Sequence, residues 1–441
     1  MVENFGYMAV QPDWTIDVKN ALDKIEGTHK FWVSAYRQGC ESIHDSAEAS
    51  AGSAATGGAT LVSLNMASGS NDVVAEYIGP NQLRLSSRRL GIAPSLYTAA
   101  AKAVTCSHIA RGTGVRSFDV SRYGGLLVAC GDDGALDVYD TDGSAHRVRL
   151  DGHVGDVTCC QFFPSGQVVL SGATDMRLKV WSASDGTNPV TLVGHTASIT
   201  DTAIVGLGKN VLSAAKDGTV RLWHCGSAAL LHTFGLSEQP VNKIDLVSRP
   251  EPDTSGSDIQ KQQQQQQRKE RENESETSGK LVAVACEDGR ALLLDLYTRE
   301  IVAEFGSIGD PPVRAIAYDA ARGIVFAGLS NGTVNVWSIA HPSAPVYAFK
   351  RGDTSPVSAV RLVRTSAGDP LLCVGSEDGQ LFLVAFSVAA GGTVVSAEIV
   401  EDLVAFDIDP IGQIRVTPST TKSATRQSVW ATGQCSRVCE F

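Results

Sequence analysis

A repeated unit of 42 residues constrains the fold of this chain more than any other feature of its sequence. The segments SGATDMRLKVWSASDG (171–186) and SAAKDGTVRLWHCG (213–226) both place a Trp six residues after an Asp. A His precedes each Asp by 22 residues, so the two copies share one register. A fixed period of this size indicates small structural units that stack on one another, because a single unit cannot bury its own hydrophobic face.

Four further copies follow the same register. In each, an Asp or Asn stands six residues ahead of an aromatic or apolar residue. These anchors are Asp133, Asp288, Asn331 and Asp378. Successive anchors are 42, 42, 71, 43 and 47 residues apart, so only one interval departs from the period.

The long interval and the chain end account for the remaining irregularities. The interval contains a Gln-rich stretch of mixed charge, and we predict a disordered insert over residues 248–279. A seventh, weaker copy ends the chain, with Cys435 at the anchor position and Phe441 at the aromatic position. Degenerate terminal copies are common in repeat proteins.

Each copy has the pattern of antiparallel strands. Segments such as VRLW and LKVW alternate apolar and polar residues, and the DG and NG dipeptides between them are typical of tight hairpin turns. Packing four-stranded blades in a ring covers both faces of every sheet. We therefore predict an all-β fold with a seven-bladed β-propeller over residues 96–441.

Residues 1–95 do not follow the repeat. The segments FWVSAY, ATLVSLN, VVAEYIG and QLRLSS predict short strands, so we expect a small β-rich extension packed on the propeller. A helix that begins after Asp13 is also expected, with Asp13 as its capping residue. Because the last copy lacks an outer strand, we expect a strand within residues 101–109 to complete that blade and close the ring.

The two best-matched copies carry the residues that most resemble catalytic groups. A His, a Ser and an Asp at one site can form a nucleophilic hydrolase. Here the same set recurs 42 residues later with a Trp attached, which favours a structural hydrogen-bond network that satisfies buried polar groups. The network residues are His153, Ser171, Asp175 and Trp181 in one copy, and His195, Ser213, Asp217 and Trp223 in the next.

Acidic residues recur in the predicted hairpin loops. In Glu287/Asp288 and Glu377/Asp378 the second residue is the structural anchor, so the first is the candidate for partner binding. Glu401 and Asp402 precede the last strand set, and we expect both to lie near the same rim of the ring. The candidates are Glu287, Glu377, Glu401 and Asp402. Carboxylates gathered on one face attract Lys and Arg from a partner and speed its approach.

Charge and composition exclude several function classes. The net charge of −11 argues against nucleic acid as the main partner, because phosphate binding requires clustered Lys and Arg. No phosphate loop or set of metal ligands at the usual spacings is present, so we expect no cofactor and no metal. No signal peptide or membrane span is predicted; we expect a monomer in the cytoplasm and nucleus.

Two stretches resemble a known family. LDGHVGDVTCCQFFPSGQVVLSGATDMRLKVWSASDG (150–186) and GHTASITDTAIVGLGKNVLSAAKDGTVRLWHCG (194–226) resemble WD40 repeats and, through the phrases CCxFFPSG and DTAIV, the proteasomal ATPase-associated factor family. The resemblance implies a non-catalytic assembly chaperone. Such a protein binds the C-terminal domain of one ATPase subunit in the base of the proteasome regulatory particle. It assists base assembly and hinders premature docking on the core particle.

Two other functions are open at this point. A generic WD40 adaptor or ubiquitin-ligase substrate receptor predicts association with a cullin adaptor, although no F-box-like helix is visible. A propeller enzyme is a third hypothesis, with the duplicated His, Ser and Asp residues as its only support.

Overall fold

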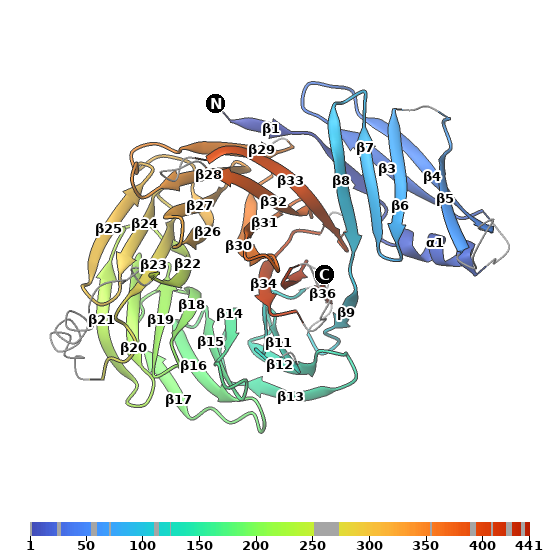
Figure 1. The fold of residues 1–441 in the computed structure, drawn as a ribbon. Coiled ribbons are helices and arrows are strands. Elements are labelled where there is room, and N and C mark those ends of the chain that lie inside the picture. Colours follow the sequence, from blue (N-terminus) through green and yellow to red (C-terminus); the bar gives the residue numbers. More distant parts are fainter. Residues whose placement is uncertain are drawn as a thin grey trace, which may run out of the picture.

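The computed structural model describes most of the chain as strands. The described residues are 2–23, 28–53, 60–69, 72–109, 114–123, 125–250, 273–352, 355–388, 394–406, 409–419, 426–433 and 437–441. Within these ranges, no helix is long and apolar enough to cross a membrane. Figure 1 shows a ring of sheets with a smaller group of strands beside it.

The ring consists of seven four-stranded units among the described residues, which we number as blades 1 to 7. In each blade of the first half, consecutive strands pair antiparallel. Blade 1 contains β10 (Ser117–Val120), β11 (Leu126–Cys130), β12 (Ala135–Asp140) and β13 (His146–Asp151). Blade 2 contains β14 (Val157–Phe162), β15 (Val168–Ala173), β16 (Arg177–Ser182) and β17 (Val190–Val193). Blade 3 contains β18 (Ile199–Val205), β19 (Asn210–Ala215), β20 (Thr219–His224) and β21 (Ala229–Gly235).

The second half repeats this arrangement. Blade 4 contains β22 (Val241–Ser248), β23 (Lys280–Cys286), β24 (Ala291–Asp295) and β25 (Glu300–Phe305). Blade 5 contains β26 (Val313–Asp319), β27 (Ile324–Leu329), β28 (Thr333–Ser338) and β29 (Tyr347–Arg351). Blade 6 contains β30 (Val357–Arg364), β31 (Pro370–Ser376), β32 (Leu381–Val388) and β33 (Val394–Val404). Blade 7 contains β34 (Gln413–Thr417), β35 (Ser428–Thr432), β36 (Arg437–Glu440) and β9 (Lys102–Thr105).

The first strand of every blade lies at the centre of the ring. These inner strands contact one another in order from β10 to β34, and β34 contacts β10 in turn. The predicted all-β propeller of seven blades is therefore confirmed.

The ring is closed by a strand from earlier in the chain, as predicted. β9 pairs antiparallel with β36, placing Val104 opposite Val438. Phe441 exchanges two backbone hydrogen bonds with Val429 on the second strand of blade 7. In blade 2, Trp181 pairs with Val169 on the second strand in the same way. Phe441 therefore occupies the aromatic position of the repeat, as predicted. Cys435, the predicted anchor of this blade, lies outside the described residues.

Polar side chains on the inner strands join neighbouring blades. Ser117 Oγ accepts a hydrogen bond from the Cys160 N–H at 3.1 Å. Across the closure, Gln413 Oε1 accepts from the Phe118 N–H at 2.9 Å. Each of these bonds pairs a backbone N–H that has no hydrogen-bond partner on a strand of its own blade. The bonds therefore stabilise the contacts between neighbouring blades.

The N-terminal extension forms its own hydrophobic core beside the ring. A four-stranded sheet contains β2 (Tyr7–Val10), β3 (Lys30–Tyr36), β4 (Ile43–Ser53) and β5 (Thr60–Met66). Three more strands, β6 (Val73–Gly79), β7 (Gln82–Ser87) and β8 (Ile92–Ala99), continue the sheet of blade 6. Trp14, Phe31 and Leu83 are among the fully buried side chains between them.

The predicted helix is present as α1 (Trp14–Leu22), but the predicted cap is wrong. Asp13 occupies the N-cap position without a side-chain hydrogen bond to the helix. Its Oδ1 instead accepts a hydrogen bond from Gln11 Nε2 at 2.7 Å. Burial of Trp14 and Val18 against the sheets therefore fixes the helix in place.

Two parallel strand pairs attach the extension to the ring. β8 pairs with β33 of blade 6, and β1 (Glu3–Phe5) pairs with β29 of blade 5. Tyr97 in β8 is opposite Asp402 in β33, so the boundary between extension and propeller crosses a continuous sheet.

The predicted disordered insert differs from the structure at its ends. Ser248 belongs to β22, and residues 273–279 contact the propeller. Glu274 is buried and forms an ion pair with Arg299, while Glu276 Oε2 accepts from the Leu207 N–H at 2.7 Å. Pattern alone could not reveal these contacts, because they satisfy polar groups of a turn in blade 3. Residues 251–272 lie outside the described residues.

Candidate protein-binding face

One face of the ring gathers the loops in which the sequence placed its candidate residues. In blades 2 to 6, the turn between the second and third strands lies beside the segment that enters the first strand. Backbone hydrogen bonds join the two, for example from Thr174 N–H to Asp156 O at 2.9 Å and from Glu377 N–H to Pro356 O at 3.0 Å. We call this side of the ring the turn face.

The two predicted His–Ser–Asp–Trp sets lie at the turn face of blades 2 and 3. His153 Nδ1 is 2.9 Å from Asp175 Oδ2, and His153 Nε2 is 2.7 Å from Ser171 Oγ. Trp181 Nε1 donates to the same Oγ at 2.8 Å. All four hydrogen-bonding groups therefore have partners.

Blade 3 repeats this geometry within 0.1 Å. His195 is 2.8 Å from Asp217 and 2.7 Å from Ser213, and Trp223 donates to Ser213 at 2.8 Å. The ionised Asp can only accept, so Nδ1 carries the imidazole proton. In the neutral ring Nε2 then accepts from the Ser hydroxyl, whose oxygen accepts from the indole. Both Ser residues are fully buried, and each joins a His of the strand entry to a Trp of the next strand by hydrogen bonds.

The surroundings of these networks oppose protonation of the imidazoles. Burial lowers the pKa of His153 and of His195, although the neighbouring carboxylates act in the other direction. Burial alone would raise the pKa of Asp217, but hydrogen bonds from Thr219, His195 and the Thr196 N–H together lower it to about 2. The neutral His and the ionised Asp are thus the stable forms at neutral pH.

Blade 4 satisfies its anchor without a His. Ser237 stands at the position that His195 has in blade 3, four residues before the first strand, and donates to Asp288 Oδ2 at 2.7 Å. Arg290 occupies the remaining space and donates to the same oxygen at 2.8 Å. The anchor Asp is therefore a structural residue even where the rest of the motif has changed.

The structure divides the four acidic candidates into two groups. Glu287 and Glu377 lie in turns of the turn face, as predicted. Glu287 accepts from Asn242 at 2.7 Å and is 3.3 Å from Arg314, so its charge is partly balanced, whereas Glu377 is exposed. Of the four candidates, Glu377 is thus the most open to a partner.

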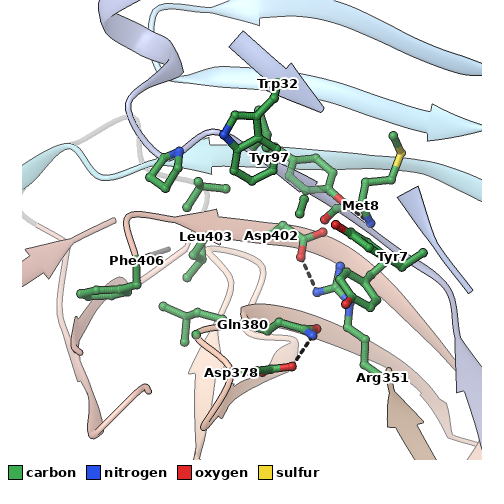
Figure 2. A pocket seen from close by; sticks show the side chains of 17 residues that line it. Tyr7, Met8, Trp32, Tyr97, Arg351, Asp378, Gln380, Asp402, Leu403 and Phe406 are labelled. Carbon is green, nitrogen blue, oxygen red and sulfur yellow. Dashed lines mark hydrogen bonds and ion pairs between the residues drawn. The ribbon is translucent and has the colours of Figure 1, made fainter. Parts of the chain in front are cut away.

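The prediction that Glu401 and Asp402 lie on an open rim is wrong. Both belong to β33, where β8 of the extension pairs with them. Glu401 forms an ion pair with Arg426 at 3.0 Å and accepts from Thr98 at 2.7 Å. The buried Asp402 forms an ion pair with Arg351 (Figure 2). No sequence pattern indicates this contact, because the paired residues of β8 and β33 are 305 positions apart.

Further carboxylates give the turn face an uneven charge. Glu238 and Asp310 lie in the segments that enter blades 4 and 5, and both are exposed. The apolar side chain of Ile308 is 76% exposed beside them. The turn face of blades 4 to 6 therefore carries the exposed carboxylates Glu238, Asp310 and Glu377 and the exposed apolar side chain of Ile308.

Sequence reasoning missed a charged layer in the centre of the ring. Asp119 and Arg415 form an ion pair at 3.1 Å, and Arg415 also donates to Cys160 O at 3.2 Å. Burial raises the pKa of Asp119 and of Asp245, which Arg415 and Arg361 oppose. All four residues lie on the first strands of their blades: Asp119 on β10, Asp245 on β22, Arg361 on β30 and Arg415 on β34. In the part of the chain that the structure describes, no group of three or more His, Cys, Asp or Glu residues is placed to hold a metal ion.

Comparison with known proteins first defines the class. Residues 145–182 and 186–224 match the family described as WD domain, G-beta repeat. Together with the ring of four-stranded sheets, this match makes the chain a WD40 β-propeller, a fold that serves as a scaffold.

Full-length relatives then define the family. The chain is 34% identical over 328 residues to Probable proteasomal ATPase-associated factor 1 of Dictyostelium discoideum, covering 71% of this chain and 73% of that protein. It is 34% identical over 232 residues to 26S proteasome regulatory subunit RPN14 of Saccharomyces cerevisiae, covering 52% and 54%. Human Proteasomal ATPase-associated factor 1 is 30% identical over 166 residues, or 36% of either chain. The chain belongs to the proteasomal ATPase-associated factor 1 family.

Proposed function

We propose that this protein is a non-catalytic assembly chaperone of the proteasome regulatory particle. It binds the C-terminal domain of one ATPase subunit of the base, assists base assembly, and hinders premature docking on the core particle. The observation that carries this proposal is family membership, since two relatives are named for association with a proteasomal ATPase and a third as a proteasome regulatory subunit.

The turn face of blades 4 to 6 is the proposed contact surface. Its exposed carboxylates, Glu238, Asp310 and Glu377, would attract a basic partner, and Ile308 would supply apolar contact. The ring holds these groups on rigid turns, because each turn is hydrogen-bonded to the neighbouring strand entry. A rigid surface loses little conformational entropy on binding.

Co-purification tests the proposal in cells. A tagged chain should bring down a free ATPase subunit or a base intermediate, and not the mature particle bound to the core, because a chaperone leaves before docking. Recovery of a cullin adaptor without any proteasomal ATPase would instead support the ubiquitin-ligase receptor and contradict the chaperone.

A further inference from the structure

A cleft of about 340 Å³ lies between the N-terminal extension and blade 6 (Figure 2). The extension contributes β2, Trp32 and Tyr97 to one wall. Blade 6 contributes the opposite wall, which runs from Asp378 to Leu381 and from Asp402 to Phe406. The cleft exists only because the extension is attached to the ring, so it belongs to neither part alone.

Aromatic side chains line the wall on the extension. Tyr7 and Tyr36 stack with ring centroids 5.0 Å apart, and Trp32 is 39% exposed beside them. Tyr97 is buried behind, where its hydroxyl donates to Met8 O at 3.2 Å. The faces of Tyr and Trp attract cations, most strongly where water is partly excluded.

The charge of the lining favours a cation. Its ionised side chains are Arg351, Asp378 and Asp402, which leaves one net negative charge. Arg351 is committed within the protein, because it forms an ion pair with Asp402 and lies over the rings of Tyr7 and Phe382. An anion entering the cleft would therefore meet no available cation among the lining residues.

Several buried polar atoms at this site lack a hydrogen-bond partner. Asp402 Oδ2 and Gln380 Oε1 are unpaired acceptors, and Arg351 Nε is an unpaired donor. Figure 2 shows Asp402, Gln380 and Arg351 together on the blade side of the cleft. These atoms lie beneath the surface of the cleft, so the polar groups open to a bound segment are those of the strand edge and of the Asp378 turn.

One edge of the cleft is an unpaired strand. β2 is the edge strand of its sheet, and no described strand pairs with it on the side away from β3. Met8 on that side bonds to the Tyr97 hydroxyl through both its N–H and its C=O. Val10, two residues further along, has the same outward orientation and lines the cleft. Because Tyr97 already bonds both outward groups of Met8, the N–H and C=O of Val10 are the groups of β2 to which the backbone of an extended segment can bond.

We propose that this cleft binds an extended peptide segment whose lysine or arginine side chain lies against the aromatic wall. The backbone of the segment pairs with the free edge of β2, and its cation lies between Trp32 and Asp378. The cleft adjoins the proposed contact with an ATPase, because Asp378 follows Glu377 in the blade 6 turn. Trp32→Ala changes the cleft and leaves every proposed contact residue of the turn face in place, so either proposal can fail without the other.

Capped pentapeptides test this site on the full chain. Ac-Ala-Val-Lys-Val-Ala-NH2 should bind saturably in ligand-observed NMR, with roughly fivefold weaker binding when norleucine replaces lysine. The same peptide with glutamate in place of lysine should not bind. Equal binding of the lysine and norleucine peptides, or no binding of any of them, would overturn the proposal.

Three variants locate the binding. Trp32→Ala and Asp378→Asn should each weaken the lysine peptide by roughly fivefold, because one removes an aromatic face and the other removes the net charge. Glu377→Gln is the matched control, since it removes a neighbouring charge that does not line the cleft, and it should leave affinity unchanged. An equal loss of peptide affinity in Glu377→Gln would show that the acidic surface attracts the lysine peptide in general, without a specific site in the cleft. Circular dichroism melting of each variant confirms that it is folded.

Discussion

At the scale of single residues, the His–Ser–Asp–Trp sets connect a loop, a turn and two strands through buried hydrogen bonds. His153 and Ser171 have almost no exposed surface, so loss of one group leaves its partners without water to replace it. The same geometry in two blades shows that the network follows from the repeat and not from a local active site.

Ser171→Ala tests this structural role. The change removes the hydroxyl that joins His153 to Trp181, so the free energy of unfolding should fall by about 1–3 kcal/mol. Urea denaturation measures it, with Leu207→Ala as a control because that side chain is 77% exposed. An unchanged midpoint for Ser171→Ala would show that the network contributes nothing to stability.

The same networks predict a dependence of stability on pH. The folded chain holds the pKa of His153 and His195 below the ordinary value of 6.5, so the unfolded state binds more protons around that pH. The free energy of unfolding should therefore fall as pH drops from 7 through about 6.5 toward 5. Asp217 adds a further loss between about pH 4 and its folded pKa of about 2.

Urea denaturation at pH 7, 6 and 5 measures this slope. The double variant His153→Gln, His195→Gln is less stable throughout, but its stability should change less over the same range. A steeper slope in that variant would contradict the neutral state of the two imidazoles.

At the scale of elements, β9 closes the ring although it precedes the propeller in the chain. Within β9, Val104 is buried and Ala103 is exposed, as a strand with one covered face requires. Residues 102–105 are too few to hold this position without pairing, so the antiparallel contact with β36 and burial of Val104 must do so.

Val104→Asp should open this closure. A carboxylate in place of a buried valine should lower the free energy of unfolding by at least about 2 kcal/mol, because Val104 packs among buried apolar side chains. Differential scanning calorimetry measures the loss. Ala103→Asp, one residue away on the exposed side of β9, is the control, and equal melting temperatures for all three chains would contradict closure by β9.

The elements also show how far the sequence could predict the structure. The sequence predicts the strands that carry the His–Ser–Asp–Trp motif, which are β15, β16, β19 and β20. The hydrogen bonds of that motif require particular residue types at a fixed spacing, and this spacing is visible in the sequence. The two parallel attachments of the extension were not evident, because β33 pairs with a distant segment and the contact has no periodic pattern. For this reason Glu401 and Asp402 were assigned to an open rim while Glu377 was placed correctly.

At the scale of the whole molecule, the ring is a rigid support with an uneven charge. Inter-blade hydrogen bonds such as that from the Phe118 N–H to Gln413 and a central layer of ion pairs hold the blades together. The turn face of blades 4 to 6 exposes acidic groups and the apolar side chain of Ile308. The molecule therefore offers one local surface suited to a basic protein domain.

Charge reversal tests which surface that is. Glu377→Lys should weaken binding to the ATPase subunit roughly tenfold and slow association most strongly at low salt, because a rim charge acts mainly on the encounter rate. Glu300→Lys is the control, because it makes the same change in exposed charge on the opposite side of the ring. Glu300 follows the turn between the third and fourth strands of blade 4. If both variants bind equally well, the turn face of blade 6 has no part in the contact.

Isothermal titration of the full chain with the purified C-terminal domain of each proteasomal ATPase subunit tests the central claim most directly. One domain should bind with a stoichiometry of one to one and more weakly as salt rises, while the others show no heat of binding. Absence of binding to every one of these domains, under conditions in which the chain is folded, would contradict the proposed function.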